Sequence, residues 1–186
     1  MSKKILVIKG SCRKDSFTNK LWQEALEENT DIDVSVFDTY SEGFSFCTGC
    51  NYCESNGKCV YRDLDLFYEK FENADVVIFA SPVYNGGFSA SVKALIDRFQ
   101  VYYTSFYKNG KVQPIKKHRK CLLVTAAGRN GEDTLREMEK NLGCAFTILN
   151  AELTGSVLCA YTDTVPNFEK ALEDLKILLR RSLLDD

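Results

Sequence analysis

Four of the eight cysteines of this 186-residue chain lie close together, at Cys47, Cys50, Cys53 and Cys59. Thiolates are the usual ligands of iron–sulfur clusters and of structural zinc, and each short Cys-x2-Cys turn points two sulfurs in the same direction. The spacing therefore predicts a cysteine-rich loop over residues 47–59 as a candidate metal site. It leaves three alternatives open: a [4Fe–4S] cluster, a tetrahedral zinc ion, or a compact loop with free thiols.

A second candidate site is the loop of residues 10–18, which reads Gly-Ser-Cys-Arg-Lys-Asp-Ser-Phe-Thr. It offers the hydroxyls of Ser11, Ser16 and Thr18 and the charge of Arg13 directly before a predicted helix, whose first amides and dipole favour an anion. The loop has neither the glycine spacing of a dinucleotide fingerprint nor a Walker Gly-Lys-Ser/Thr, so we expect a terminal phosphate monoester. The alternative is that Ser16 or Thr18 only caps the helix.

A third candidate site follows a strongly apolar run and consists of Pro82, Val83, Tyr84, Asn85 and Gly86. Here a predicted strand ends at a proline, an aromatic side chain follows, and two adjacent glycines allow backbone to approach a ligand closely. The pattern predicts a cradle for a planar ring, which would lie against Tyr84 and near the amides that follow it. The glycine-rich loop around Gly128 would form one wall. The alternative is an ordinary β–α turn with a packed tyrosine.

Short apolar runs alternate with amphipathic stretches, so strands alternate with helices along the chain. Expected strands cover residues 4–9, 32–37, 74–80, 121–126 and 145–153. Expected helices cover 17–28, 89–100, 132–142 and 168–183, with a further helix that is capped by Asp63 and carries Phe67 and Phe71; residues 101–118 are expected to be irregular. Such alternation predicts an α/β three-layer sandwich with a five-stranded parallel sheet in the flavodoxin-like order 2-1-3-4-5. In that order, ligands bind outside the carboxyl ends of the strands. The loops after the first, third and fourth strands, which contain residues 10–18, residues 82–86 and Gly128, are expected there.

The composition, with 45% hydrophobic and 27% charged residues, is typical of a globular protein, and the length predicts a single domain over residues 1–186. A net charge of −2 offers no field for nucleic acid or an anionic membrane. No apolar run approaches a membrane span or a signal peptide. We expect a cytoplasmic protein, where a disulfide framework would not form and clustered cysteines indicate metal or redox chemistry.

The sequence resembles the NADPH-dependent FMN reductase and iron–sulfur flavoprotein branch of the flavodoxin-like superfamily. The motifs that carry the resemblance are Gly10-Ser11-x-Arg13…Ser16-x-Thr18, the four clustered cysteines, Ser81-Pro82-Val83-Tyr84 and Lys93…Asp97-Arg98. They follow the family's order and spacing from the first residues to about Gly131. Two positions depart from it: Phe17 replaces a small polar residue, and Leu64 stands where the family has one of two aspartates, which leaves only Asp63 as a cap.

The resemblance implies that FMN is bound without a covalent bond. Its phosphate would be held by Ser11, Arg13, Ser16, Phe17 and Thr18, with Phe17 contributing its backbone amide. Its isoalloxazine ring would be held by Pro82, Val83, Tyr84, Asn85, Gly86 and Gly128. The cysteine spacing matches the compact motif of the iron–sulfur flavoproteins, but relatives without a cluster carry it as well.

The resemblance also implies a function: an FMN-dependent oxidoreductase that takes electrons from NAD(P)H and passes them to a small-molecule or protein acceptor. It implies a homodimer or a higher homo-oligomer. The flavin carries the electron chemistry itself, so we assign no side chain as catalytic. Two alternatives stay open: an iron–sulfur flavoprotein that carries electrons without oxidising nicotinamide directly, and a zinc- or thiol-based binding module that has lost the flavin.

Overall fold

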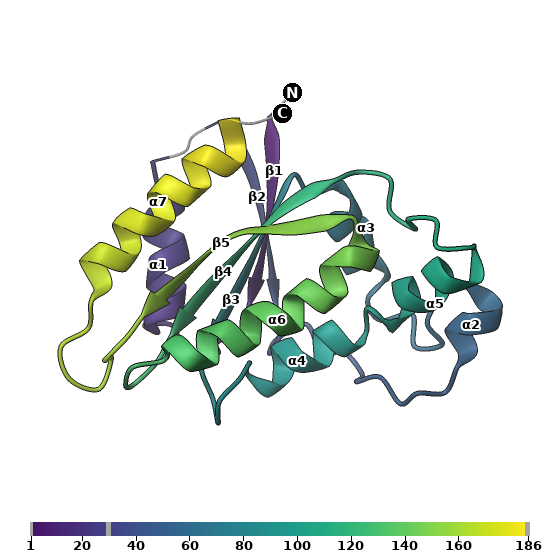
Figure 1. Cartoon of the computed structure of the whole chain (residues 1–186), viewed down its shortest axis with the longest axis horizontal. Helices are drawn as coiled ribbons and strands as arrows, with labels where there is room; N and C mark the ends of the chain where they lie inside the picture. The colour runs from purple at the N-terminus through teal and green to yellow at the C-terminus, as the bar shows by residue number, and fades with distance from the viewer. Residues whose placement is uncertain (1, 29–30, 185–186) are drawn as a thin grey trace.

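The computed structural model describes residues 2–28 and 31–184, and a five-stranded sheet forms its centre (Figure 1). The strands run in the order β2-β1-β3-β4-β5, and all neighbouring pairs are parallel. Their bounds are β1 Lys3–Lys9, β2 Ile32–Asp38, β3 Val76–Pro82, β4 Arg119–Ala126 and β5 Ala151–Cys159. The predicted flavodoxin-like order is confirmed.

Helices cover both faces of this sheet, which makes three layers (Figure 1). One face carries α1 (Phe17–Leu26) and α7 (Phe168–Leu184), and the other carries α3 (Asp65–Asn73), α4 (Ala90–Asp97) and α6 (Glu132–Leu149). The short helix α2 (Tyr52–Asn56) and α5 (Gln100–Lys108) lie against each other beyond the sheet. None of the described helices is both long and apolar enough to cross a membrane.

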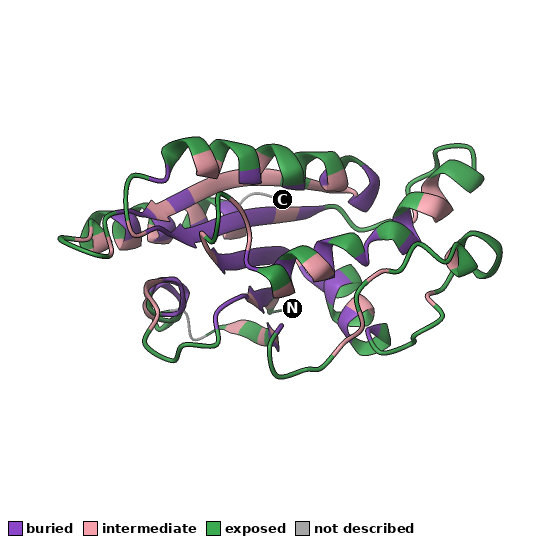
Figure 2. Cartoon of the chain, turned by 90° about the horizontal axis from the view of Figure 1, so that it is seen from below, coloured by how far each residue is buried: buried purple, intermediate pink, exposed green. Residues whose placement is uncertain are grey.

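The alternating side chains of β1 show why two apolar layers form. Leu6 and Ile8 pack into the core under α3, α4 and α6, whereas Ile5 and Val7 pack into the core under α1 and α7. Successive residues of a strand point to opposite faces, so an unbroken apolar run serves a strand that is covered on both sides. Figure 2 shows the buried sheet between helices whose outer surfaces are exposed.

The last strand lies later in the chain than predicted. Residues 145–149 continue helix α6, and β5 covers Ala151–Cys159 instead of residues 145–153. The buried side chains of α6 keep helical spacing through this region, at Met138, Leu142, Phe146 and Leu149. A short apolar run cannot be distinguished from the end of an amphipathic helix by composition, and here the continuing apolar face of the helix prevails.

Two smaller predictions are also wrong. Residues 101–118 are not irregular throughout, because α5 forms where Val101 and Tyr102 bury one side of a helical turn. Asp63 does not cap α3, whose N-cap residue is Leu64 without a side-chain cap bond. The Asp63 carboxylate accepts hydrogen bonds from Arg98 and from the amide of Ser45 instead. A guanidinium stabilises a carboxylate more strongly than a single helix amide does.

Candidate functional site

The loop from β1 into α1 places two hydroxyls side by side. Ser16 is the N-cap of α1, and its Oγ accepts a hydrogen bond from the amide of Asn19 at 3.2 Å. The same Oγ lies 3.2 Å from Oγ1 of Thr18. The helix-cap role that the sequence left as an alternative is therefore real for Ser16, and it leaves the Thr18 hydroxyl beside it in the first turn.

Asn19 fixes the shape of this loop, a role that the sequence analysis missed. It is 1% exposed, and its Nδ2 donates to the carbonyl of Arg13 at 2.6 Å and to that of Ser11 at 3.4 Å. In the sequence, the only sign of this role is that a polar residue follows Thr18 in the first turn of a predicted amphipathic helix. In the structure, both Thr18 and Asn19 are fully buried. A buried polar side chain at such a position is expected to hold backbone, because it must find partners.

The first amides of α1 are free to bind an anion. Among the described residues, no protein group accepts a hydrogen bond from the amides of Phe17 and Thr18. The ring of Phe17 lies against Phe168 of α7, with centroids 6.0 Å apart, so its side chain points away from the loop. That arrangement agrees with the expectation that Phe17 contributes its amide. The exposed Arg13 lies on the same loop.

The turn after β3 is a tight hairpin. The amide of Tyr84 donates to the carbonyl of Gly87 at 3.0 Å, and the amide of Gly87 donates back at 3.1 Å. Asn85 and Gly86 both have positive φ, at 48° and 78°, as a type I′ turn requires. Among described residues, nothing accepts a hydrogen bond from their two amides. Tyr84 is 42% exposed in this chain, so the alternative of a packed tyrosine is not observed.

These two turns leave neighbouring strands at the same edge of the sheet. The amide of Gly10 donates to the carbonyl of Ala80 at 2.7 Å, which joins the end of β1 to the end of β3. The strand order reverses between β1 and β3, which is where open α/β sheets bind their ligands. The structure therefore brings residues 10–18 and 82–86 together.

Neighbouring loops extend this edge. Val83 donates its amide to the carbonyl of Ala126, which ties the turn to β4. Gly128 lies two residues after the end of β4, and the carboxylate of Asp163 packs against it: a Cβ at position 128 would lie 2.2 Å from Asp163 Oδ2. Asp163 comes from the loop after β5. The predicted strand over residues 145–153 ends too early to bring this loop to the edge, whereas β5 ends at Cys159.

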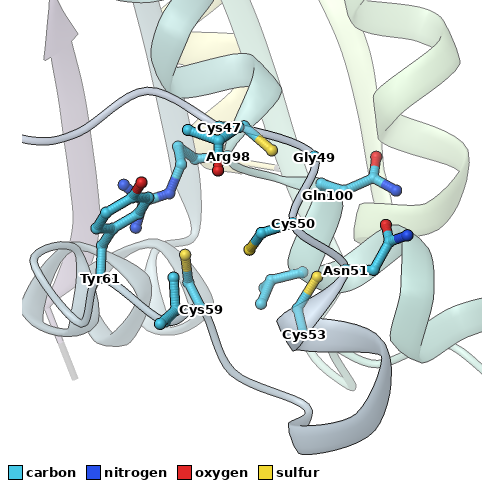
Figure 3. Close-up of a pocket in the computed structure, with 12 residues that line it drawn as sticks. Cys47, Gly49, Cys50, Asn51, Cys53, Cys59, Tyr61, Arg98 and Gln100 are labelled. Atoms are coloured by element: carbon cyan, nitrogen blue, oxygen red, sulfur yellow. The ribbon is translucent and has the colours of Figure 1, made fainter.

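The four clustered cysteines line a single pocket elsewhere, beside α2 and the start of α5 (Figure 3). They belong to the long segment between β2 and α3. The pocket and the hairpin lie at opposite ends of α4, whose N-cap Ser89 donates its amide to Ser81 Oγ at 3.0 Å. Within residues 2–28 and 31–184, no three His, Cys, Asp or Glu side chains are arranged to hold a metal ion.

A buried arginine borders the cysteine pocket. Arg98, the C-cap residue of α4, is 2% exposed and lines the same pocket as the four cysteines. Its Nη2 donates to Asp63 at 2.6 Å, and its Nη1 donates to the carbonyl of Ser45 at 2.5 Å. The Tyr61 ring lies 5.6 Å from the guanidinium. The neighbouring pair of the sequence motif, Lys93 and Asp97, forms an exposed ion pair of 2.6 Å.

The charges around Arg98 stabilise one another. Burial opposes the positive charge of Arg98, but its hydrogen bond to Asp63 and the negative charge of that carboxylate help to raise its pKa above the ordinary value. Burial likewise raises the pKa of Asp63, and the hydrogen bonds from Arg98 and from the Ser45 amide outweigh it, so that this pKa is lowered. Both groups therefore stay ionised near neutral pH.

Comparison with known proteins agrees with this architecture. The family model for NADPH-dependent FMN reductase matches residues 3–156. An iron–sulfur flavoprotein of Methanocaldococcus jannaschii is 33% identical over 140 residues, which cover 73% of this chain and 69% of that protein. An iron–sulfur flavoprotein of Archaeoglobus fulgidus is 38% identical over 102 residues, which cover 53% of this chain and 46% of that protein. The chain thus spans only about half the length of the second relative.

Two solved structures share the fold. An FMN-dependent NADH-azoreductase from Bacillus anthracis in complex with FMN has a TM-score of 0.64 at 14% identity, covering 98% of this chain and all 100% of that chain. An NAD(P)H:quinone oxidoreductase from Methanothermobacter marburgensis has a TM-score of 0.66 at 18% identity, covering 98% of this chain and 94% of that chain. At such low identity the likeness establishes the three-layer arrangement alone.

Proposed function

The chain belongs to the NADPH-dependent FMN reductase family, and on that premise we propose that it binds FMN at the β1–β3 edge and transfers electrons from NAD(P)H to a small-molecule or protein acceptor. Membership makes it an oxidoreductase of the flavodoxin-like fold. The observation that supports the FMN site is the pair of adjacent turns, residues 10–18 and 82–86. Each turn has backbone amides whose hydrogen bonds no described protein group accepts.

The loop of residues 10–18 holds the phosphate in this proposal. The amides of Phe17 and Thr18 and the hydroxyls of Ser16 and Thr18 surround the start of α1, where the helix dipole favours a dianion. Arg13 adds positive charge from the exposed side. Asn19 keeps the loop open by binding two of its carbonyls from below, so that they do not turn toward the phosphate.

The hairpin of residues 84–87 holds the ring. Its two free amides, of Asn85 and Gly86, can donate to the polar edge of an isoalloxazine, while Tyr84 offers a flat apolar face. Bound FMN supplies hydride acceptance and electron release. The protein binds, orients and tunes it. Pro82, Val83 and Gly128 complete the walls, with Asp163 fixing the loop that carries Gly128.

The cysteine segment carries a second part of the proposal: Cys47, Cys50, Cys53 and Cys59 hold a [4Fe–4S] cluster. Supporting it are the compact spacing, the shared pocket and the likeness to two iron–sulfur flavoproteins. In such a cluster each cysteine binds a different iron, so the sulfurs need not converge on one point. A single zinc ion does require that convergence, so the arrangement favours zinc less.

The phosphate assignment is tested by comparing FMN with riboflavin, which lacks the phosphate. In a Ser16→Ala/Thr18→Val double variant, we expect FMN to bind at least 10-fold more weakly, because two charge-assisted hydrogen bonds are lost. Riboflavin, which shares only the ring contacts, should bind both proteins equally well. Titration of flavin fluorescence measures the four affinities.

Equal loss of both ligands would indicate general damage to the helix start and would count against the assignment. Unchanged FMN affinity would contradict it outright. A Phe17→Leu variant serves as the matched control, because it changes the side chain that packs on Phe168 and leaves the amide in place. We expect it to keep the FMN affinity of the parent.

A second candidate function is an electron carrier that does not oxidise nicotinamide directly, which the four-cysteine pocket favours. Stopped-flow mixing with NADH or NADPH separates the two. Rapid bleaching of the flavin supports the reductase. Bleaching only after addition of a reduced ferredoxin supports the carrier, and a colourless protein with bound zinc would support a regulatory module.

We further propose that the chain acts as one FMN-binding domain in the cytoplasm, where a reducing environment keeps thiol ligands available, and that it forms a homodimer or a higher homo-oligomer. The support for assembly is a pair of exposed aromatic side chains on α5, Tyr103 at 44% and Tyr107 at 51% exposed, of a kind enriched at interfaces. Sedimentation of the parent and of a Tyr103→Ser/Tyr107→Ser variant tests this: a shift to monomer supports it, and an unchanged mass contradicts this choice of surface.

A further inference from the structure

Arg98 joins the two ends of the cysteine segment. Its guanidinium binds the carbonyl of Ser45, two residues before Cys47, and the carboxylate of Asp63, four residues after Cys59. Asp63 in turn accepts the amide of Ser45 at 2.7 Å. One buried cation and one carboxylate thus close the segment into a loop, whatever the loop contains.

The third polar group of Arg98 is not used by this clamp. Its Nε is buried and has no hydrogen-bond partner among the described residues. A buried donor of a charged group that stays unpaired is costly and rare in proteins, so an unpaired one indicates an acceptor that is still to be supplied. The side chain is 1% exposed, which leaves bulk water a poor candidate.

The pocket that Arg98 borders offers such acceptors. The four cysteines line it together with Arg98, and Figure 3 shows their side chains around the same space, with Arg98 along one side. Sulfur is a weak acceptor as a thiol and a far better one as a metal-bound thiolate or sulfide, which carries negative charge. Hydrogen bonds to such sulfurs, and charges near them, set the reduction potential of a cluster.

We propose that Arg98 is the positioning residue of the four-cysteine site: it clamps the segment at Ser45 and Asp63, and it donates its Nε–H to a sulfur of the bound cluster. Its positive charge offsets part of the negative charge of the cluster and so favours the reduced state. This inference rests on the proposed function, in which Cys47, Cys50, Cys53 and Cys59 hold the cluster. It adds to the site a residue that the spacing of the cysteines does not imply.

The test uses the full chain, reconstituted with iron and sulfide under anaerobic conditions, and three variants. Arg98→Gln removes the charge and the Nε–H donor, Arg98→Lys keeps the charge, and Asp63→Asn breaks the same clamp while it keeps Arg98. Iron and acid-labile sulfide per chain are measured first, and the midpoint potential is then measured by redox titration of the visible and electron paramagnetic resonance signals. Circular dichroism reports folding.

We expect Arg98→Gln to hold the cluster roughly 10-fold less tightly, as is usual for an outer-shell partner, and to lower its midpoint potential. Asp63→Asn should raise the potential, because Arg98 then keeps an uncompensated charge beside the sulfurs. Arg98→Lys should restore most of the potential. If Arg98 were only a structural clamp, Arg98→Gln and Asp63→Asn would shift the midpoint potential in the same direction. Shifts of opposite sign therefore distinguish an electrostatic role of Arg98 from a purely structural one.

The inference is overturned if loaded Arg98→Gln keeps the parent potential, or if both variants shift it the same way. Should Arg98→Gln fail to fold, Asp63→Asn decides: a raised potential supports the inference, and a lowered or unchanged one overturns it. A parent protein that takes up no iron and sulfide sinks the cluster proposal and this inference together. The flavin proposal is judged separately, by the FMN and riboflavin titrations.

Discussion

Gly10 and Val92 approach each other so closely that no side chain fits between them: a Cβ on Gly10 would lie 2.4 Å from Cγ2 of Val92 and 2.7 Å from the carbonyl oxygen of Ala80. Gly10 is the residue at which β1 ends and the loop of residues 10–18 begins. Val92 belongs to α4, which follows the hairpin after β3. The two turns of the proposed flavin site are therefore held together by the Val92 side chain and the Ala80 backbone, which pack directly on the backbone of Gly10.

Replacing Gly10 by alanine should destabilise the protein by about 1–3 kcal/mol, as overpacking of a tight contact usually does. Gly87→Ala is the matched control, because the space around Gly87 is open within 4 Å and we expect its effect to stay within about 0.5 kcal/mol. Urea unfolding measures both free energies. Equal stability of the two variants would contradict the close packing of Gly10.

The hairpin gives a prediction that separates flavin binding from stability. Gly86 has φ 78°, a conformation that costs an alanine roughly 1–2 kcal/mol. We expect Gly86→Ala to weaken FMN binding, because the free amides of the turn change direction. Gly110→Ala carries a similar strain, at φ 67°, in the loop between α5 and β4, and should leave FMN affinity intact. If both variants bind FMN as the parent does, the hairpin does not hold the ring.

Acid should weaken the clamp between Asp63 and Arg98. The pKa of Asp63 is lowered in the folded protein, although burial alone would raise it, because the hydrogen bonds from Arg98 and the Ser45 amide prevail. A lowered carboxyl pKa stabilises the folded state at every pH above the pKa of the unfolded chain, which is about 4. This contribution is lost as the pH falls through the folded pKa.

Asp63→Asn should therefore be less stable than the parent at pH 7, and the difference should shrink as the pH falls below about 4 and through the folded pKa of Asp63. Urea unfolding of both proteins at pH 7, 5, 4 and 3 checks this. A gap that stays constant over the whole range would show that Asp63 does not act through its charge.

Buried thiols should resist alkylation. Burial raises the pKa of Cys159 to about 11 and also raises the pKa of Cys121, and both side chains are fully buried. Only the thiolate reacts with iodoacetamide. At pH 8 we expect the exposed Cys12 and Cys144 to be alkylated in the native protein, and Cys121 and Cys159 only after unfolding.

Mass spectrometry of peptides after a timed reaction identifies the modified residues. Modification of Cys159 at the rate of Cys144 would mean that the end of β5 opens readily. The comparison also tests where β5 lies along the chain, since a strand over residues 145–153 would have left Cys159 in a loop.

The sequence was sufficient for the sheet order because unbroken apolar runs identify strands that are covered on both faces, as at Ile5–Ile8 and Val76–Ala80. It failed at β5, where an edge strand contains polar residues and the preceding helix ends in an apolar run. Edge strands need less apolar character, because one long side lacks a neighbouring strand. Composition therefore favoured the wrong segment.

At the candidate site, the residues with a local signal were found and those with only a tertiary role were not. Ser16 and Thr18 were found because hydroxyls precede a helix. Asn19 and Asp163 hold loops from a distance, through contacts that exist only once the chain is folded. Arg98 was noticed as part of a motif, yet its position beside the cysteines depends on α4 running from the hairpin to the cysteine pocket.

Helix α2 buries none of its own residues, and the segment that carries it leaves the sheet at the edge strand β2 and returns at α3. Up to Cys59, this segment adds only the half-buried side chains of Phe44, Cys53 and Cys59 to the edge of one core. The cysteine segment can loosen as a separate cooperative unit while the sheet stays intact, and its amide hydrogens should exchange with solvent well before those of β1 and β3. Uptake of a cluster would then be an act of local folding, completed on a scaffold that is already assembled.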